Sequence, residues 1–253
     1  MRRRRCCAGR SGSSRGGAAD VYPELARLAV VVPVGPGDAI APVLRAQLAA
    51  LPTDAEVRVV CATISDLARI RSLTTSGAEA RWHYQLAPPG RATQQNAGAE
   101  AATRSWLWFL HADSQFAPGT LTTLADFLHG DQPALGYFDL RFLDDGPPLM
   151  PLNAFGAWLR SRWLGLPFGD QGLVLPRAVF DALGGFDSTL RCGEDHDLVW
   201  RARRAGVPLR PLHAPLYTSA RKYAEHGWAR VTARHLGASW RQARRFGRGR
   251  GDA

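Results

Sequence analysis

The stretch SWLWFLHADSQ, residues 105–115, decides the fold class, because a run of apolar residues ends abruptly at His111 and Asp113. Five consecutive large apolar residues, 106–110, are typical of a strand that is buried on both faces of a parallel sheet. In an open α/β sheet, ligands lie in the crevice outside the carboxyl ends of the strands. The segment therefore predicts a buried strand that ends at a ligand site.

The residues before this stretch alternate between strand-like and helix-like segments. Strands are predicted at 25–34, 56–62 and 81–86, and helices at 41–51, 65–73 and 92–104. This alternation predicts right-handed βαβ crossovers and a mostly parallel sheet with helices on both faces. We therefore expect an α/β fold of the Rossmann-like type, with residues 27–115 as its nucleotide-binding half.

After residue 115 the pattern changes. The remaining segments predict helices at 117–130, 148–165 and 193–206, a strand with one solvated face at 134–143, a strand and helix at 172–186, and a long basic helix at 223–247. No internal repeat is found. We expect these segments, residues 116–246, to form an acceptor half with a C-terminal helical extension, in a single domain that spans 27–246.

The positive charge is concentrated at the two ends of the chain. Of the formal net charge of +10, residues 1–20 carry +5 and residues 240–253 carry +4. Residues 1–26 are therefore interpreted as a disordered basic leader and 247–253 as a basic tail. The nearly neutral remainder does not fit a specific nucleic-acid reader, whose basic residues would cover a folded face.

The four cysteines show neither metal-site spacing nor a disulfide framework, which favours a reducing cytosol. No run approaches the ~20 apolar residues that span a bilayer. We expect a cytoplasmic protein with at most peripheral contact at the inner membrane face. The segment AFGAWLRSRWLG, residues 154–165, and the last helix have Trp and Arg at spacings that suit such contact near a lipid-linked acceptor. Core packing explains the same apolar residues.

His111 and Asp113 lie two residues apart, on one side of an extended segment. Such a pair can chelate a divalent cation that bridges the oxygens of a diphosphate, and the imidazole favours Mn²⁺ over Mg²⁺. The same spacing also fits an Asp113 that caps the following turn and a His111 that packs against it. The sequence leaves both interpretations open.

Glu194, Asp195 and Asp197 crowd the first turn of a predicted helix. Acids there stabilise a helix through its dipole without any other role, and the spacing alone favours that interpretation. The alternative is that one carboxylate takes a proton from an incoming hydroxyl. The loop PVGPGD, residues 33–38, is neither G-x-G-x-x-G nor a Walker A loop, so dinucleotide and ATP chemistry lose their main support.

The order of FLHADSQ, GDQGLVLPRAVFDALGGFD and GEDHDL resembles family 2 glycosyltransferases of the GT-A fold, and RATQQNAG, FLHAD and TSARK together resemble a bacterial subgroup of unassigned substrate. The resemblance covers about residues 28–246. It implies a metal-dependent, inverting transfer of a sugar from a nucleoside-diphosphate donor to a hydroxyl acceptor. It also implies that Asp113 and His111 replace the family's Asp-x-Asp as ligands of Mn²⁺ or Mg²⁺, and that Asp195 is the catalytic base with Glu194 in support.

The same resemblance assigns further contacts. It implies donor contacts for Arg91, Asn96, Arg221 and Lys222, and an acceptor and sugar pocket at Gly169, Asp170 and Gln171. The chain departs from the family at PVGPGD, where Pro-x-x-Asn-Glu is usual, and at Cys61, where an aspartate contacts uracil; Asp66 and Asp38 are nearby acids.

Two other functions remain open on the sequence. A non-catalytic binding module agrees with the lost base-contacting acid at Cys61, whereas the acids Asp113, Glu194 and Asp195 argue against it. A nucleotidyltransferase would use a similar sheet but needs Arg and Lys in a glycine-rich loop after the first strand, and PVGPGD has neither.

Overall fold

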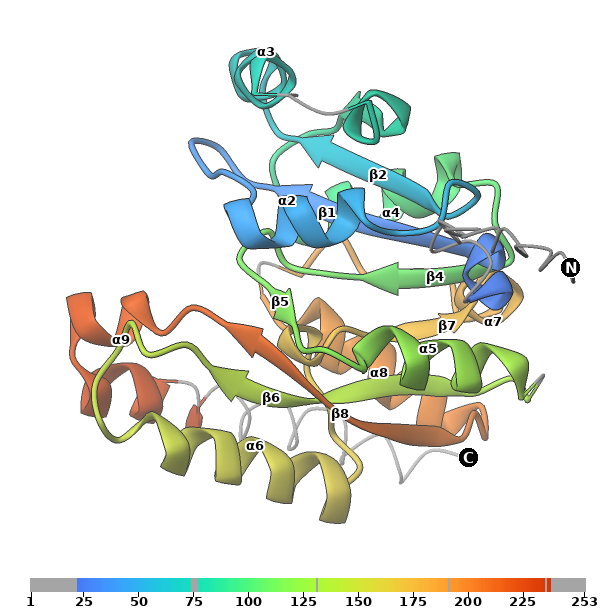
Figure 1. The fold of residues 1–253 in the computed structure, drawn as a ribbon. Coiled ribbons are helices and arrows are strands. Elements are labelled where there is room, and N and C mark those ends of the chain that lie inside the picture. Colours follow the sequence, from blue (N-terminus) through green and yellow to red (C-terminus); the bar gives the residue numbers. More distant parts are fainter. Residues whose placement is uncertain (1–21, 74–76, 131, 191, 235, 238–253) are drawn as a thin grey trace, which may run out of the picture.

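The structure is a computed structural model that describes residues 22–73, 77–130, 132–190, 192–234 and 236–237. Residues 1–21 of the predicted leader and the whole predicted tail lie outside the described residues. The described chain forms one eight-stranded sheet in the order β3-β2-β1-β4-β7-β6-β8-β5 (Figure 1). Its strands are β1 Leu28–Val34, β2 Glu56–Cys61, β3 His83–Leu86, β4 Trp106–Phe109, β5 Gln115–Phe116, β6 Leu135–Phe142, β7 Val174–Pro176 and β8 Leu209–Thr218.

The sheet is parallel in its first half and mixed in its second half. Strands β3, β2, β1 and β4 all run in one direction, as the βαβ pattern predicts. Strand β7 then pairs antiparallel with both β4 and β6, while β6 and β8 are parallel and β5 is antiparallel to β8. The carboxyl ends of β1, β2 and β4 therefore meet at one edge, on the left in Figure 1.

Helices cover both faces of the sheet, which confirms the expected α/β fold class. In Figure 1, α2 and α5 lie in front of the sheet, whereas α4, α7 and α8 lie behind it. The helices are α2 Pro42–Ala49, α3 Ile64–Ser72, α4 Arg91–Ala101, α5 Thr120–His129, α6 Met150–Trp163, α7 Arg177–Ala182, α8 Glu194–Arg204 and α9 Arg221–His226, with short 3₁₀ turns η1 Pro23–Arg27, η2 Glu79–Arg81 and η3 Gly169–Gln171.

The core consists of two layers separated by the sheet. Strand β1 is buried along its whole length: Val30 and Val32 face the layer beneath α2 and α5, and Val31 faces the layer beneath α4 and α8. Helix α4 approaches β1 closely because it has a glycine at the contact. A Cβ on Gly98 would lie 2.5 Å from Cγ1 of Val31, so a larger residue would push the helix off the sheet.

Two elements differ from the sequence expectation. Residues 134–143 do form a strand, β6, but Leu135–Phe138 are buried on both faces because β6 is an interior strand covered by helices. The helix predicted over 223–247 is interrupted at Gly227, whose φ of +83° ends α9, and helical residues resume at 228–234. Its predicted residues 238–247 lie outside the described part of the chain.

Candidate active site

The carboxyl end of β4 opens into the turn that carries the His-Ala-Asp motif. The amide of Leu110 still bonds to the carbonyl of Val31 on β1, but the amide of Ser114 already bonds back to the carbonyl of His111, each at 3.1 Å. The chain therefore turns sharply as it leaves the sheet. Both His111 and Asp113 lie in this turn and are partly exposed. This is the edge at which α/β sheets hold ligands.

Arg91 connects the first turns of two helices at this edge. It is the first residue of α4, and its Nε donates to Oε1 of Glu194, the first residue of α8. Its Nη1 lies 3.2 Å from Nε2 of His111. Burial favours loss of the Arg91 proton, but the carboxylates of Asp195 and Glu194 outweigh burial and raise its pKa. The buried Glu194 carboxylate therefore holds a charged guanidinium beside the His-Ala-Asp turn.

Asp195 is fixed by two backbone donors. The amide of Gly169 donates to Oδ2 at 2.5 Å, and the amide of His196 donates to Oδ1 at 2.9 Å. Burial acts to raise the pKa of Asp195, but His196, Arg91 and these two amides overcome it and lower the pKa to about 2. A Cβ on Gly169 would lie 2.9 Å from Oδ2, so glycine permits this close approach. Asp195 is an ionised carboxylate of fixed orientation.

Asp170 lies in the same group of charges as Asp195, but it lacks the two backbone donors that fix Asp195. Its Oδ1 is buried without a hydrogen-bond partner among the described residues. Burial raises the pKa of Asp170 to about 6, with Asp195 and Asp113 adding to the shift and Arg160 and Arg91 opposing it. A buried carboxylate oxygen without a partner is costly, so Asp170 is the carboxyl here that most favours a donor or a proton.

Asp170→Asn is expected to stabilise the protein above about pH 6. The folded chain holds this proton more tightly than the unfolded chain, in which the carboxyl has its ordinary pKa of about 3.8. The free energy of unfolding therefore falls as pH rises from about 4 to about 6. Asn removes this loss, which is worth roughly 3 kcal/mol at pH 7 because one pKa unit corresponds to about 1.4 kcal/mol. Thermal unfolding at pH 4 and pH 7.5 measures it; Asp126→Asn, an exposed acid on α5, is the control. An equal or lower Tm for Asp170→Asn at pH 7.5 would contradict the prediction.

Gln171 holds the turn that presents Gly169 and Asp170. Its side chain is fully buried, and Nε2 donates to the carbonyl of Phe138 at 2.9 Å. Its Oε1 accepts from the Phe168 amide at 3.1 Å and from Nη2 of Arg160 at 3.3 Å. Gln171, predicted as a pocket residue, is thus fully bonded within the protein and shapes η3 from behind.

Arg160 and His196 belong to the site although sequence reasoning did not select them. The guanidinium of Arg160, on α6, lies over the ring of Phe168, and the His196 ring lies against the same ring at 3.3 Å between centroids. Burial lowers the pKa of Arg160 to about 10, still charged at neutral pH, while Asp170 and Asp195 oppose the shift. No motif marks these residues, because only the fold brings α6 and α8 to η3.

His111 and Asp113 are the two side chains that the sequence predicts as metal ligands. Burial and the neighbouring Arg91 lower the pKa of His111 to about 4, so its imidazole is neutral and suited to bind a metal at pH 7. No described residue donates a hydrogen bond to the carboxylate of Asp113. Within the described ranges, no three His, Cys, Asp or Glu side chains gather closely enough to hold a metal ion. The His-Ala-Asp turn thus supplies two side chains of ligand type, one imidazole and one carboxylate.

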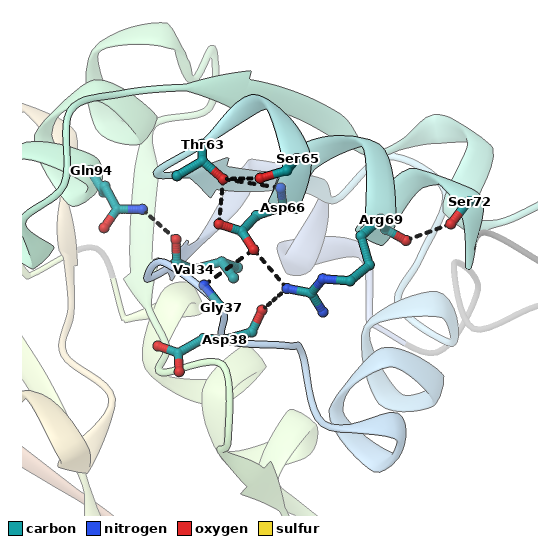
Figure 2. Close-up of polar contacts among 9 residues, drawn as sticks. All are labelled: Val34, Gly37, Asp38, Thr63, Ser65, Asp66, Arg69, Ser72 and Gln94. Carbon is teal, nitrogen blue, oxygen red and sulfur yellow. Dashed lines mark hydrogen bonds and ion pairs between the residues drawn. The ribbon is translucent and has the colours of Figure 1, made fainter.

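Figure 2 shows how Asp66 ties the loop after β1 to the start of α3. Its carboxylate accepts from Oγ1 of Thr63 at 2.5 Å, from Nη2 of Arg69 at 2.9 Å and from the amide of Gly37 at 3.2 Å. The bonds from Thr63 and Arg69 lower the pKa of Asp66 and keep it ionised. Arg69 also donates to the carbonyl of Asp38, whose own carboxylate points away from this network (Figure 2). Asp66 is thus occupied in holding the loop.

Cys61 and Gln94 complete this end of the sheet. Burial raises the pKa of the Cys61 thiol to about 11, so it remains neutral and packs as an apolar residue. Nε2 of Gln94, from α4, donates to the carbonyls of Val34 at 2.7 Å and Val60 at 2.8 Å, the first of which is visible in Figure 2. Gln94, which the sequence did not single out, therefore fixes the carboxyl ends of β1 and β2 side by side.

The other predicted donor contacts are spread more widely. The amide of Asn96 forms two bonds with the backbone of Phe186, at 2.7 and 2.9 Å, and joins α4 to the loop before α8. Arg221 and Lys222 are exposed at the start of α9. The charge of Lys222 contributes to the low pKa of His111, which places it near the His-Ala-Asp turn. Asn96 therefore makes a packing contact between α4 and this loop, and Arg221 bonds locally to Oγ of Ser219 at 3.1 Å.

Part of the chain matches a known family, and most of it aligns with solved structures. Residues 86–190 match the model of glycosyl transferase family 2. The chain aligns with S. aureus TarS 1–349 in complex with UDP-GlcNAc at 16% identity and a TM-score of 0.57, over 76% of this chain and 58% of that one. It aligns with the mannosyltransferase PcManGT from Pyrobaculum calidifontis, in complex with GDP-Man and Mn²⁺, at 20% identity and a TM-score of 0.63, over 87% and 64%.

The chain covers less than two thirds of either solved chain, and no curated protein matches it. At these identities the structural likeness concerns the fold, and it confirms the expected GT-A-type architecture. The matched segment contains the His-Ala-Asp turn, η3 and the strand and helix that follow it. Residues 86–190 are thus similar to glycosyl transferase family 2, and the chain around them has the fold of the two glycosyltransferase structures with which it aligns.

Proposed function

We propose that the protein is a glycosyltransferase that moves a sugar from a nucleoside-diphosphate donor to a hydroxyl acceptor with inversion at the anomeric carbon. The observation that carries the proposal is the gathering of four acids, Asp113, Asp170, Glu194 and Asp195, with Arg91 and Arg160 at the carboxyl edge of β4. Buried carboxylates with pKa values pushed in opposite directions are typical of sites that move protons.

The donor diphosphate would lie between the His-Ala-Asp turn and α9. Arg91, Arg221 and Lys222 supply positive charge on its two sides, and His111 and Asp113 would hold Mn²⁺ or Mg²⁺ together with phosphate oxygens. The cation would neutralise the charge that develops on the departing diphosphate. Complexes of the two similar solved structures with UDP-GlcNAc and with GDP-Man and Mn²⁺ support a nucleotide sugar and a metal here.

The acceptor would enter beside η3, where Asp195 is the base. The acceptor oxygen forms a bond to the anomeric carbon, the bond from that carbon to the diphosphate oxygen breaks, and the acceptor proton passes to Asp195. A single displacement inverts the anomeric configuration. The amides of Gly169 and His196 keep the carboxylate ionised and aimed, and Glu194 contributes by positioning Arg91. Asp170, with its unpartnered oxygen, would bind a hydroxyl of the sugar or acceptor.

The location that we propose is the cytoplasm, with the acceptor carried by a lipid at the inner membrane face. The sequence supports a reducing compartment through its cysteine pattern. Among the described helices, none combines the length and apolar character needed to cross a bilayer. Contact with a membrane would therefore be peripheral within this part of the chain.

Calorimetric titration tests the proposal. We expect one of UDP, GDP, CDP and ADP to bind in the presence of Mn²⁺ at least tenfold more tightly than the others, and more weakly once the metal is chelated. With the matching nucleotide sugar, slow release of the free sugar should show inverted configuration by proton NMR. If no nucleotide binds with either metal, the proposal is wrong and a non-catalytic binding module becomes the better interpretation.

A further inference from the structure

Exposed apolar side chains are concentrated on one helix. Of the twelve large apolar residues that the described chain exposes, seven lie within residues 149–164. We name these seven the α6 face: Leu149, Leu152, Phe155, Trp158, Leu159, Trp163 and Leu164. Their exposed fractions run from 40% to 76%, so core packing, one of the two explanations that the sequence allowed, does not account for them.

Helix α6 buries mostly small side chains and exposes large apolar ones, whereas an ordinary surface helix buries its large apolar side chains. Its buried positions are Met150, Ala154, Ala157 and Ser161, which recur every three or four residues and are mostly small. They allow α6 to pack closely on β6, where the Tyr137 hydroxyl bonds to the Ser161 carbonyl at 3.1 Å. The large apolar residues therefore face outward. Contiguous apolar surface of this kind marks an interaction site.

The outward side of α6 carries aromatic side chains and no acidic residue. The rings of Phe155 and Trp158 are stacked at 5.9 Å with an angle of 17° between their planes. Trp163, 76% exposed, extends the surface toward the end of the helix. Residues 149–165 contain no Asp or Glu. Tryptophan beside arginine is the composition of side chains that lie at the boundary between lipid headgroups and acyl chains.

Basic residues flank the α6 face on two sides. Residues 228–234 are tied to the helix through Asn153, which bonds Trp228 at 2.6 Å and Thr232 at 3.0 Å, and they expose Arg230 and Arg234. At the other end, Nη1 of Arg203 donates to the carbonyl of Leu164 at 2.8 Å. The sequence after this segment, 238–253, adds five arginines and one aspartate. The exposed Arg230 and Arg234 complement an anionic surface.

We propose that the α6 face lies in the interface of a membrane that contains anionic phospholipids. A symmetric pairing of two copies through this face fits less well, because it would bring the basic flanks of both copies together. An anionic bilayer would bury the apolar side chains of the α6 face in its interface and would also attract the basic residues on both sides of that face.

The same helix connects the membrane to the candidate site. From the side of α6 away from solvent, Arg160 reaches Gln171 and the ring of Phe168, beside Asp170. Docking would thus set η3 close to the bilayer, within reach of an acceptor hydroxyl on a lipid headgroup. This last step rests on the proposed function, whereas membrane binding itself does not.

Vesicle flotation of the full chain tests the inference. The wild type is expected to float with vesicles of phosphatidylcholine and 30% phosphatidylglycerol, and much less with phosphatidylcholine alone. Phe155→Ser/Trp163→Ser should reduce flotation about tenfold or more, because two large apolar side chains are lost from the interface. The matched control is Leu73→Ser/Leu86→Ser, which removes two side chains of similar exposure elsewhere and should float like the wild type.

Three results would overturn the inference: no flotation of the wild type at low salt, equal flotation with both kinds of vesicle, or undiminished flotation of Phe155→Ser/Trp163→Ser. A dimer that this double variant abolishes, detected by light scattering without lipid, would assign the face to a second copy instead. Titration of the double variant with nucleoside diphosphates separates the two hypotheses. Nucleotide binding should be unchanged, so a failure of either hypothesis is seen independently of the other.

Discussion

Asp195→Asn is expected to lower the turnover number by about 10²–10⁴-fold while donor binding persists, because the acceptor proton loses its carboxylate. The substitution also changes the hydrogen bonds that hold the side chain, so the variant must be checked for its structure as well as its activity. Asn offers one acceptor oxygen where Asp195 has two, so only one of the Gly169 and His196 amides keeps its bond. Thermal unfolding and nucleotide titration of the variant show whether η3 and the donor site remain in place.

Two further variants make the assignment of the base specific. Asp197→Asn alters the next acid in the same helical turn, whose carboxylate bonds Arg201 at 2.7 Å, and should leave turnover within a few fold of wild type. Asp170→Asn should weaken binding of sugar or acceptor more than it lowers the maximal rate. If Asp170→Asn abolished turnover and Asp195→Asn did not, the base would be Asp170, and its pKa of about 6 would set the acidic limb of the pH profile.

The parallel half of the fold could be read from the sequence because its strands are long apolar runs between helices with clear periodicity. Strands β8 and β5 could not be predicted from the sequence. Strand β8 contains Pro211 and Pro215, and proline normally argues against an interior strand; it is accommodated beside β6 where the register shifts between Tyr137 and Asp139. Strand β5 has only two residues, Gln115 and Phe116, and its pairing with β8 is set by tertiary contacts.

The candidate site also has some features that the sequence predicts and others that depend on the tertiary fold. The positions of Asp113 and Glu194 at the end of a strand and the start of a helix follow from local pattern. The ion pair of Glu194 with Arg91, the approach of Gly169 to Asp195 and the reach of Arg160 toward η3 join residues far apart in sequence. These contacts decide which acid has a raised pKa and which a lowered one, and spacing in one sequence contains no information on them.

The second large effect is expected at Asp113. Asp113→Ala should weaken nucleoside-diphosphate binding in Mn²⁺ by about 10²-fold without weakening the lower-affinity binding that is measured in the absence of metal. The reason is that Asp113 supplies the only anionic ligand of the proposed pair, and a metal that bridges to phosphate contributes several kcal/mol. Titration with and without Mn²⁺ measures both affinities. Asp126→Ala on α5, an exposed acid elsewhere, should behave as the wild type in both.

His111→Ala distinguishes a metal site from a purely electrostatic one. As a neutral imidazole, His111 contributes to metal binding but little to the charge around the diphosphate. If Asp113 acts through a metal, both variants should lose most of the gain in nucleotide affinity that Mn²⁺ gives. The remaining preference for Mn²⁺ over Mg²⁺ should be smallest in His111→Ala, which lacks the imidazole. If Asp113→Ala instead tightened metal-free binding and Mn²⁺ still helped, Asp113 would merely repel the phosphates, and the cation would have to bind through other acids of the site.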